Sequence, residues 1–400
     1  MPNTILTPTA VTRAAAAILH QKLNFVGRVN RQYDDQYKGS GAPVKGKFGP
    51  TLKIRMPNEY TVRTGINMSA QDTNETSVDL TVSTVKGVDM NFTSQELALS
   101  LEDFSERIIE PAMSVLAANI EADALSMYQE VYNLVDGDTV AFGFNATSDA
   151  STALTKMLAP MSGRTMTMNP DHANRFRKDT KGLFQAADNI SKQYRDGIIG
   201  MTSGFEVYEN TLLVPHGTGT AAKTTGYLVN GATQTGSTLV VDTGTTTFNR
   251  GDVFTIANVF RVHPETKANT GELQQFVVLT TTGTSATSLS ISPAIVTSGA
   301  RQNVSASPAD NAAITKVGAG ASETLVQSLA FHKDAFAFVT ADLPLPEGTD
   351  FAAREVVDGI SVSLVRDFSI SDRSFPCRLD VLYGYKAIRP QLAARVHNDG

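Results

Sequence analysis

Positions near the N-terminus recur at the spacing of a helix. They stand three or four residues apart on one face, at Val11, Ala15, Ile18, Lys22, Phe25 and Val29, and this spacing predicts an amphipathic helix. Residues 33–48, which follow, are rich in glycine, lysine and aspartate and indicate a loop. The sequence therefore predicts an arm on a flexible lead. Such an arm buries its apolar face poorly alone, so we expect another domain or subunit to cover it.

The period then changes from about 3.6 to two. Apolar and polar residues alternate over 52–62 and again over 78–92, and a polar stretch at 67–76 separates the two runs. Two alternating runs about a polar tip predict a long β-hairpin with one apolar face. Because an isolated two-stranded hairpin is marginally stable in water, we expect this hairpin to lie on another surface.

A second helical pattern covers 93–137. Thr93 and Glu96 match a capping box, and apolar positions continue in helical steps until Gly137. At 1.5 Å per residue an unbroken helix of this length would span roughly 60 Å. Pro111 interrupts the pattern, and we expect it to kink the helix or to separate a short first piece from a long second one.

The remaining chain changes character twice. Residues 150–214 indicate a mixed α/β region that includes a strand at 165–169 followed by a turn or helix start. From about Pro215 to Gly320 the composition shifts towards Thr, Gly, Ser and Val, and short apolar runs alternate with turn residues. This pattern predicts a small all-β barrel or sandwich. Because strand-like α/β character returns near Leu325, we interpret the β-rich stretch as an insertion. The last strand-like run ends at Tyr385, and Arg389-Pro390 opens a short C-terminal tail.

Composition favours a folded soluble protein, with 41% hydrophobic and 18% charged residues. The net charge of −6 argues against a dedicated nucleic-acid binder. A single cysteine, Cys377, excludes an intrachain disulfide and a cysteine-based metal site, and favours folding in a reducing compartment. No apolar run approaches the roughly 20 residues that cross a bilayer. The apolar string at 14–19 is too short for a signal-peptide core.

The sequence contains no pattern typical of a catalytic or metal site. The six histidines are scattered, and lone residues such as His172 and His263 fit structural roles better than catalytic ones. Gly217-Thr218-Gly219 resembles half of a phosphate loop, but no helix with a lysine follows, so we interpret it as a flexible linker. An acidic cluster early in the long helix is best explained by the helix dipole; it consists of Glu102, Asp103, Glu106 and Glu110. We expect no enzyme, no catalytic, cofactor-binding or metal-binding residue, and no cofactor.

Four stretches carry a resemblance to a known family: Leu329-Ala330-Phe331-His332-Lys333-Asp334-Ala335-Phe336, Cys377-Arg378-Leu379-Asp380-Val381-Leu382-Tyr383-Gly384 with Arg389-Pro390, Leu116-Ala117-Ala118-Asn119-Ile120-Glu121, and Asn249-Arg250-Gly251-Asp252-Val253. With the order of the predicted elements, they resemble the P22-like bacteriophage coat protein family. The resemblance implies an α+β, HK97-type capsid fold with N-arm helix, E-loop β-hairpin, spine helix, P-domain and A-domain, and an inserted small all-β domain.

The resemblance also implies a division into seven parts. These are an N-terminal arm at 1–38, an E-loop hairpin at 39–92, a P-domain with the spine helix at 93–138, a first A-domain part at 139–214, an inserted β-barrel-like domain at 215–322, an A-domain return at 323–350, and final P-domain and A-domain strands with a C-terminal tail at 351–400.

The implied function is that of a major capsid protein of a tailed bacteriophage, which self-assembles into an icosahedral shell around double-stranded DNA. The implied partners are further copies in hexamers and pentamers, a scaffolding protein during assembly, a portal protein, and packaged DNA contacted non-specifically on the inner face, but no membrane. The protein would be located in the virion and assembled in the host bacterial cytoplasm. We expect some apolar residues to be exposed on a single subunit and buried between subunits, namely Val11, Ile18, Val78, Leu80 and Val82.

The sequence leaves two alternative functions open. An encapsulin-like compartment would share the fold, although the insertion argues against it. A β-rich phage surface or tail adhesin would bind glycan through the Thr-rich insertion, but it leaves the arm and the long helix unexplained.

Overall fold

A computed structural model describes residues 23–32, 51–68, 70–71, 75–93, 110–135, 142–180, 199–318, 320–357, 360–371 and 374–398. The chain divides into two compact units. The first comprises Met1–Ile54, Ser77–Leu125 and Phe336–Lys386, and the second comprises Arg55–Thr76, Ser126–Ala335 and Ala387–Gly400. The predicted α+β class is confirmed, whereas the finer division into seven parts stays a prediction.

The first unit is built on a five-stranded sheet with the order β16-β19-β18-β17, in which β3 also pairs with β19. The strands are β3 (Thr84–Thr93), β16 (Phe336–Ala341), β17 (Phe351–Val357), β18 (Ile360–Arg366) and β19 (Ser374–Ala387). Alternate residues of β19, at Leu379, Val381 and Tyr383, are fully buried, as expected for one face of a strand. Helix α4 (Glu110–Leu125) packs against β3 and buries its apolar stripe.

The predicted long hairpin is only partly correct. Its paired part is a two-stranded sheet of β1 (Thr51–Arg55) and β2 (Ser77–Thr81). Residues 56–62 form no strand, and Val62 is 94% exposed. The second alternating run splits, because β3 leaves β2 and pairs with β19 over ten residues from Thr84 to Thr93. An alternating run shows which side is apolar, but it does not identify the partner strand.

The predicted helix to Gly137 is wrong at its C-terminal end. Helix α4 ends at Leu125, a 3-10 turn η3 (Ser126–Glu130) follows, and Leu134–Val135 form the short strand β4, because β4 pairs in parallel with the C-terminal strand β20. Pro111 is the second residue of α4, which begins at Glu110, and proline is tolerated in the first turn of a helix. Thr93 ends β3, and Glu96 lies outside the described residues.

The second unit contains a seven-stranded mixed sheet with the order β4-β20-β15-β5-β7-β6, to which β8 adds by pairing with β15. Helix α5 (Phe144–Lys156) packs on β20, and α6 (Pro170–Thr180) packs on β15. The predicted strand at 165–169 and the helix start after it are confirmed. The strands are β5 (Arg164–Met168), β6 (Met201–Thr202), β7 (Phe205–Glu209), β8 (His216–Gly217), β15 (Thr324–His332) and β20 (Ala393–Asn398); the short turns η4 (Lys333–Ala335) and η5 (Pro390–Leu392) precede β16 and β20.

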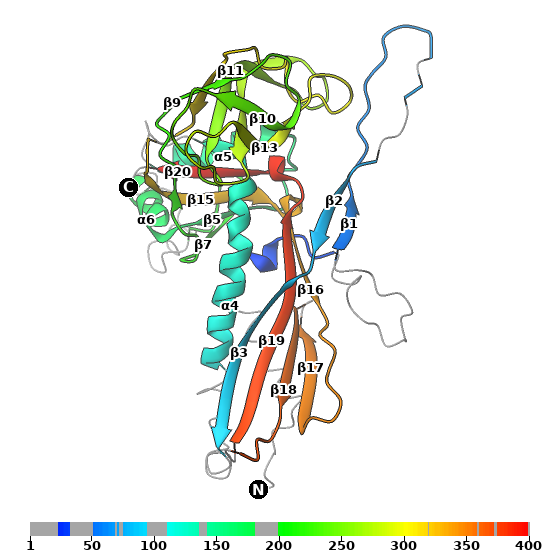
Figure 1. Ribbon diagram of the computed structural model, residues 1–400, viewed down its shortest axis with the longest axis vertical. Coiled ribbons are helices and arrows are strands. Elements are labelled where there is room, and N and C mark those ends of the chain that lie inside the picture. The colour runs from blue at the N-terminus through cyan, green and yellow to red at the C-terminus, as the bar shows by residue number, and fades with distance from the viewer. Residues whose placement is uncertain are drawn as a thin grey trace, which may run out of the picture. The chain divides into compact units, whose positions relative to one another are not determined.

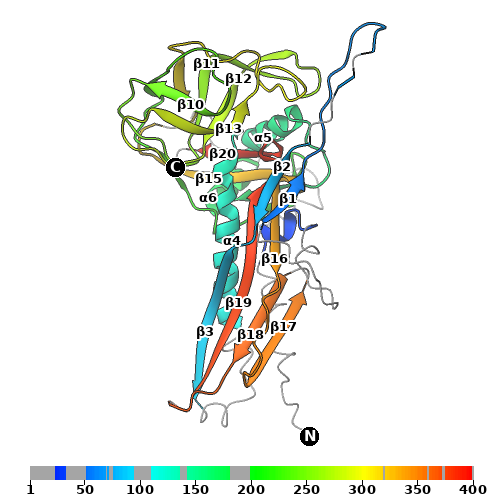
Figure 2. The same ribbon diagram turned by 45° about the vertical axis from the view of Figure 1, so that its right-hand side comes forward.

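The predicted β-rich stretch forms a closed six-stranded barrel with the order β10-β13-β12-β11-β14-β9. It lies over β15 and β20 of the sheet (Figures 1 and 2). Its interior holds a row of rings, in which Phe248 and Phe254 are 6.1 Å apart and Phe254 and Phe276 are 5.9 Å apart. The strands are β9 (Thr224–Val229), β10 (Gly236–Asp242), β11 (Val253–Val262), β12 (Asn269–Val278), β13 (Ser288–Ile295) and β14 (Ala313–Lys316).

The predicted C-terminal tail is wrong. Arg389-Pro390 leads into η5 and then into β20, which pairs along β15 from Phe331↔Ala393 to Val326↔Asn398. Ala393, Ala394 and Val396 are fully buried. Small and β-branched residues that are buried on both faces give no alternating pattern, so this strand could not be distinguished from a tail.

The segment Leu23–Gln32 near the N-terminus contains one 3-10 turn, η1 (Val26–Arg28). Asn30 forms an isolated parallel bridge with Ala337 of β16. This segment therefore belongs to the edge of the first unit.

Candidate functional site: the junction of barrel and sheet

The residues predicted to contact other subunits lie in different environments. Val11 and Ile18 fall outside the described residues, and Val78 on β2 is half-buried. Leu80 and Val82 are 0% and 6% exposed, so the expectation that they are exposed on a single subunit is wrong. The backbone of β19 at Gly384 approaches Thr81 and Val82 so closely that a Cβ there would collide with them. The role of these five residues between subunits stays a prediction.

Two chain segments connect the barrel to the sheet, and we call them the neck (residues 216–221 and 316–325). They pair at Gly217↔Thr324 and His216↔Leu325. The Thr218 N–H donates to the Glu323 carbonyl at 2.8 Å, and the Glu323 N–H donates to Thr218 Oγ1 at 3.0 Å. The interpretation of Gly217-Thr218-Gly219 as a flexible linker is therefore wrong, because its backbone is held by the outgoing segment.

Asp252, which precedes β11, joins the neck to the barrel. Its Oδ1 accepts a hydrogen bond from His216 Nε2 at 3.1 Å. Its Oδ2 accepts from the backbone N–H groups of Gly219 at 3.0 Å and Asn249 at 2.9 Å. Because a carboxylate only accepts, His216 carries its proton on Nε2, which leaves Nδ1 to accept from the Tyr128 hydroxyl at 3.4 Å.

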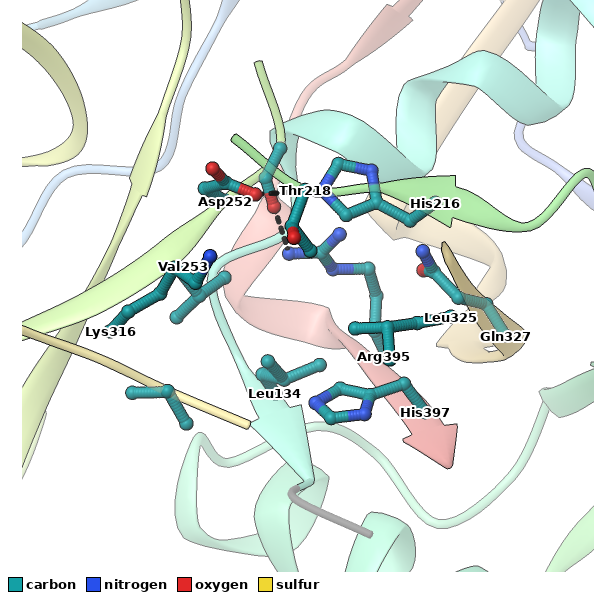
Figure 3. Close-up of a pocket in the computed structure, with 12 residues that line it drawn as sticks. Leu134, His216, Thr218, Asp252, Val253, Lys316, Leu325, Gln327, Arg395 and His397 are labelled. Atoms are coloured by element: carbon teal, nitrogen blue, oxygen red, sulfur yellow. Dashed lines mark hydrogen bonds and ion pairs between the residues drawn. The ribbon is translucent and has the colours of Figure 1, made fainter. Parts of the chain in front are cut away.

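Two buried cations complete this group (Figure 3). Lys316, at the end of β14, donates through Nζ to the Ala221 carbonyl at 2.6 Å. Arg395, on β20, donates through Nη2 to the Gly251 carbonyl at 2.6 Å, and its guanidinium lies 5.8 Å from the centre of the Tyr128 ring. Lys316 and Arg395 are 1% and 2% exposed. Asp252 and backbone carbonyls thus compensate charges that would otherwise be costly to bury.

Burial shifts the titration of each member of this group. It lowers the pKa of His216 and of Lys316, and it lowers the pKa of Arg395 to about 10. For Asp252 burial acts to raise the pKa, but hydrogen bonds from His216, Asn249 and Gly219 outweigh it and hold the pKa below its usual value. At neutral pH the group therefore contains a neutral imidazole, a carboxylate and a charged guanidinium.

The space inside this group is too small for a substrate. The cavity that these residues line measures about 10 Å³, which is room for about one water molecule. In the described ranges no cluster of three or more His, Cys, Asp or Glu side chains is arranged to hold a metal. The same residues include no helix that is long and apolar enough to cross a membrane. The geometry fits a structural junction.

Further contacts join the barrel to the sheet side of the unit. The Gln275 side chain on β12 bonds both backbone groups of Leu134 on β4, at 2.7 and 3.0 Å. Val253 and Val277 of the barrel pack with Tyr132 in a small apolar cluster. Two sets of charged contacts lie at the rim: Arg250 with Glu130, and Glu272 with both Lys156 and Arg261.

Sequence reasoning missed most of this junction. Asp252 lies in one of the four stretches that resemble the P22-like family. No spacing relates it to Gly219 or to Lys316, which lie 33 and 64 positions away in the sequence. His172 is fully buried, stacks on Phe142 with ring centres 4.0 Å apart and bonds Ser328 through Nδ1 at 2.8 Å. Of the acidic cluster, Glu110 begins α4, and the other three residues lie outside the described part.

The comparison with protein families decides what this chain is. The model described as "P22 coat protein - gene protein 5" matches residues 44–395. The chain belongs to the P22 coat protein family. It is accordingly a structural capsid protein of the tailed-phage type, and not an enzyme. The encapsulin-like and adhesin alternatives are not favoured.

Similar solved structures were also found for this P22-type coat protein. A Mycobacterium phage Che8 chain is 15% identical, covers 94% of this chain and 90% of its own, and has a TM-score of 0.48. The cyanophage P-SCSP1u capsid is 10% identical over 95% of this chain and 98% of its own, with a TM-score of 0.44. The CUS-3 coat protein I-domain is 32% identical over 24% of this chain and 96% of its own, with a TM-score of 0.20. No curated protein matches.

Proposed function

We propose that this coat protein self-assembles, as hexamers and pentamers, into an icosahedral shell that encloses the double-stranded DNA of a tailed phage. The observation that carries the proposal is the family match, which extends from residue 44 to residue 395. A scaffolding protein and a portal protein are the further partners during assembly in the host cytoplasm. A net charge of −6 suits weak, non-specific contact with DNA, since tight DNA binding depends on many basic contacts to phosphate.

The exposed segment 60–68 supports this proposal. Within it Tyr60, Val62, Ile66 and Met68 are 59%, 94%, 97% and 85% exposed. Several large apolar side chains exposed within one short segment are typical of a surface that binds a partner. The segment lies in the predicted E-loop, and in a shell it would be covered by a neighbouring copy.

The junction supports a second part of the proposal, that the barrel braces the subunit. The barrel and the sheet are connected at separate places, by the neck, the Asp252 group, the Gln275 hydrogen bonds and the apolar cluster. A subunit in a shell must keep its shape under the load of packaged DNA. We therefore propose residues 215–322 as an inserted domain that holds the sheet of the second unit in one arrangement.

Sedimentation of the purified chain tests the proposed assembly. The protein, alone and with the proposed scaffolding protein, is brought to assembly conditions and run on a sucrose gradient. We expect a fast-sedimenting species of uniform size, formed with a sharp dependence on protein concentration. A single slow species at every concentration, with and without the scaffolding protein, contradicts the proposal.

A further inference from the structure

A buried carboxylate on α4 plays no part in the junction described above. Glu121 is 1% exposed. Its Oε1 accepts a hydrogen bond from the backbone N–H of Phe25, and its Oε2 accepts from the N–H of Val26 at 3.2 Å. Glutamate is almost never buried this deeply unless it is paired. Here its hydrogen-bond donors are two successive peptide groups near the N-terminus of the chain, 95 and 96 positions away.

The segment that Glu121 holds is itself packed into the first unit. Its apolar residues are at most 6% exposed, namely Leu23, Phe25, Val26 and Val29. The Phe25 ring lies 5.7 Å from the Phe336 ring. Beyond η1, the Asn30 N–H donates to the Phe336 carbonyl at 3.0 Å, and the Phe338 N–H donates to the Asn30 carbonyl at 3.1 Å. The segment is therefore held at two places, by Glu121 on α4 and by β16.

The two kinds of contact act differently. Apolar burial is non-directional, so it holds the segment on the surface without fixing the path of its backbone. Hydrogen bonds to a carboxylate are directional and roughly twice as strong as neutral ones. Because the two carboxylate oxygens each take one N–H, they fix the orientation of the peptide groups at Phe25 and Val26. The backbone of the described segment is thereby fixed near its N-terminal end, next to Leu23.

We propose that Glu121 is a positioning residue that fixes the root of the predicted N-terminal arm. In Figure 1 the dark-blue helical turn at 26–28 lies beside α4. The N–H of Val26, at the start of this turn, donates to the Glu121 carboxylate at 3.2 Å. Contacts made by the predicted arm would then depend on this carboxylate. The consequence for assembly rests on the proposed shell function, whereas the clasp on the segment does not.

Side-chain chemistry makes the proposal testable. Glu121→Gln keeps the shape but replaces one accepting oxygen with an NH₂ donor, which faces a backbone N–H. Glu121→Asp keeps both oxygens but shortens the reach by one methylene. Glu347→Gln is the matched control, because Glu347 is an exposed residue that lies outside the segment.

Limited trypsin digestion of the free subunit gives the first readout, because Arg28 and Arg31 lie within the held segment. In Glu121→Gln we expect cleavage there at least ten times faster than in the wild type, while hydrogen exchange in β19 is unchanged. Glu121→Asp should fall between the two, and Glu347→Gln should match the wild type. Equal cleavage rates in Glu121→Gln and the wild type would overturn the proposal.

Hydrogen exchange of the wild type tests the proposal even if Glu121→Gln does not fold. A peptide covering residues 23–32 should exchange as slowly as peptides from α4. Exchange at the rate of an exposed loop would overturn the proposal without any variant.

Assembly of the folded variant gives the last readout. If the wild type forms shells, Glu121→Gln with a released segment should form several-fold fewer closed ones. Equal yields would mean that the segment does not position the arm for assembly. If the wild type itself forms no shells, the shell function fails, while the digestion result still decides whether Glu121 holds the segment.

Discussion

Asp252 is the residue on which the barrel junction depends most. It accepts from His216, Gly219 and Asn249, and its charge faces that of Lys316. Asp252→Ala leaves two backbone N–H groups and the His216 imidazole without their acceptor. It also removes the negative charge beside the buried Lys316, so we expect the free energy of unfolding to fall by about 3 kcal/mol. Urea denaturation followed by circular dichroism measures this loss.

The control for this variant is Asp149→Asn. Asp149 is an exposed residue of α5, so its substitution should change stability by less than about 0.5 kcal/mol. If Asp252→Ala were as stable as Asp149→Asn, the junction would not depend on this carboxylate.

Because His172 is buried, we expect the free energy of unfolding to fall in mild acid. Burial, with the charges of Arg175 and His397, lowers the pKa of His172 from 6.5 to about 3. Below about pH 6.5 the unfolded chain binds a proton at His172 and the folded chain does not. The contribution of neutral His172 to the free energy of unfolding is therefore fully present above that pH and is lost as the pH falls towards 3. At pH 5 the loss from this residue is about 2 kcal/mol.

Urea midpoints at pH 7.5 and pH 5.0 check this expectation. The midpoint should be lower at pH 5.0, and His172→Leu should reduce the difference. Equal midpoints at the two pH values in the wild type would show that His172 titrates normally.

At the residue scale the sequence was informative about single side chains and silent about their partners. The expectation of a structural role for His172 fits its buried position against Phe142 and Ser328. Nothing in the sequence relates Asp252 to His216 or Arg395, because these residues meet only after β8, β11 and β20 have assembled. Long-range polar contacts between single residues leave no periodic signal.

At the element scale the barrel offers a prediction about packing. A Cβ at Gly244 would overlap the Tyr227 ring, and that ring is fixed because its hydroxyl donates to Thr246 at 2.5 Å and accepts from the Ala286 N–H at 3.2 Å. We expect Gly244→Ala to lower the free energy of unfolding by about 2 kcal/mol. Thermal denaturation of the purified protein measures it.

Gly283 offers a matched control in the same barrel. No atom lies within 4 Å of the position where its Cβ would be, so Gly283→Ala should be close to neutral. A melting temperature that changes equally in both variants would contradict the packing explanation.

Barrel strands were the elements that the sequence predicted best. The short apolar runs lie in β10, β11, β12 and β13, since turn residues bound each run and aliphatic residues fill it. β9 and β14 were missed because threonine, glycine and lysine occupy much of them. The long hairpin was wrong in extent for a different reason: period two identifies a strand but not its partner, and the second run pairs with β19.

At the scale of the whole molecule the exposed segment 60–68 carries a prediction about assembly. Val62 and Ile66 are almost fully exposed, so Val62→Asp with Ile66→Asp should leave the fold of a subunit unchanged. In a shell these positions would lie against a neighbour, where an unpaired carboxylate is costly to bury. We expect the double variant to assemble at least ten times less efficiently, measured by light scattering.

The control is Thr64→Asp, which adds a charge at an exposed polar position between them. It should assemble more nearly like the wild type. Normal assembly of the double variant would mean that this segment does not lie between subunits.

Pattern alone predicted a protein built for contacts, with an arm, a hairpin and a long helix that need partners. It could not identify the partners, because an apolar face is equally well covered by another domain, another protein or another copy. Family membership, over residues 44–395, is the observation that assigns this chain to phage coat proteins. The number of subunits in a shell is a property of the assembled particle and has no counterpart in the periodicity of one chain.

Electron microscopy of the chain, purified with its scaffolding protein under assembly conditions, tests whether the protein builds a shell. We expect closed, uniform shells whose subunit density contains the barrel, the seven-stranded sheet and the five-stranded sheet with α4. Particles that remain monomeric under all conditions in which the protein is folded would contradict this expectation.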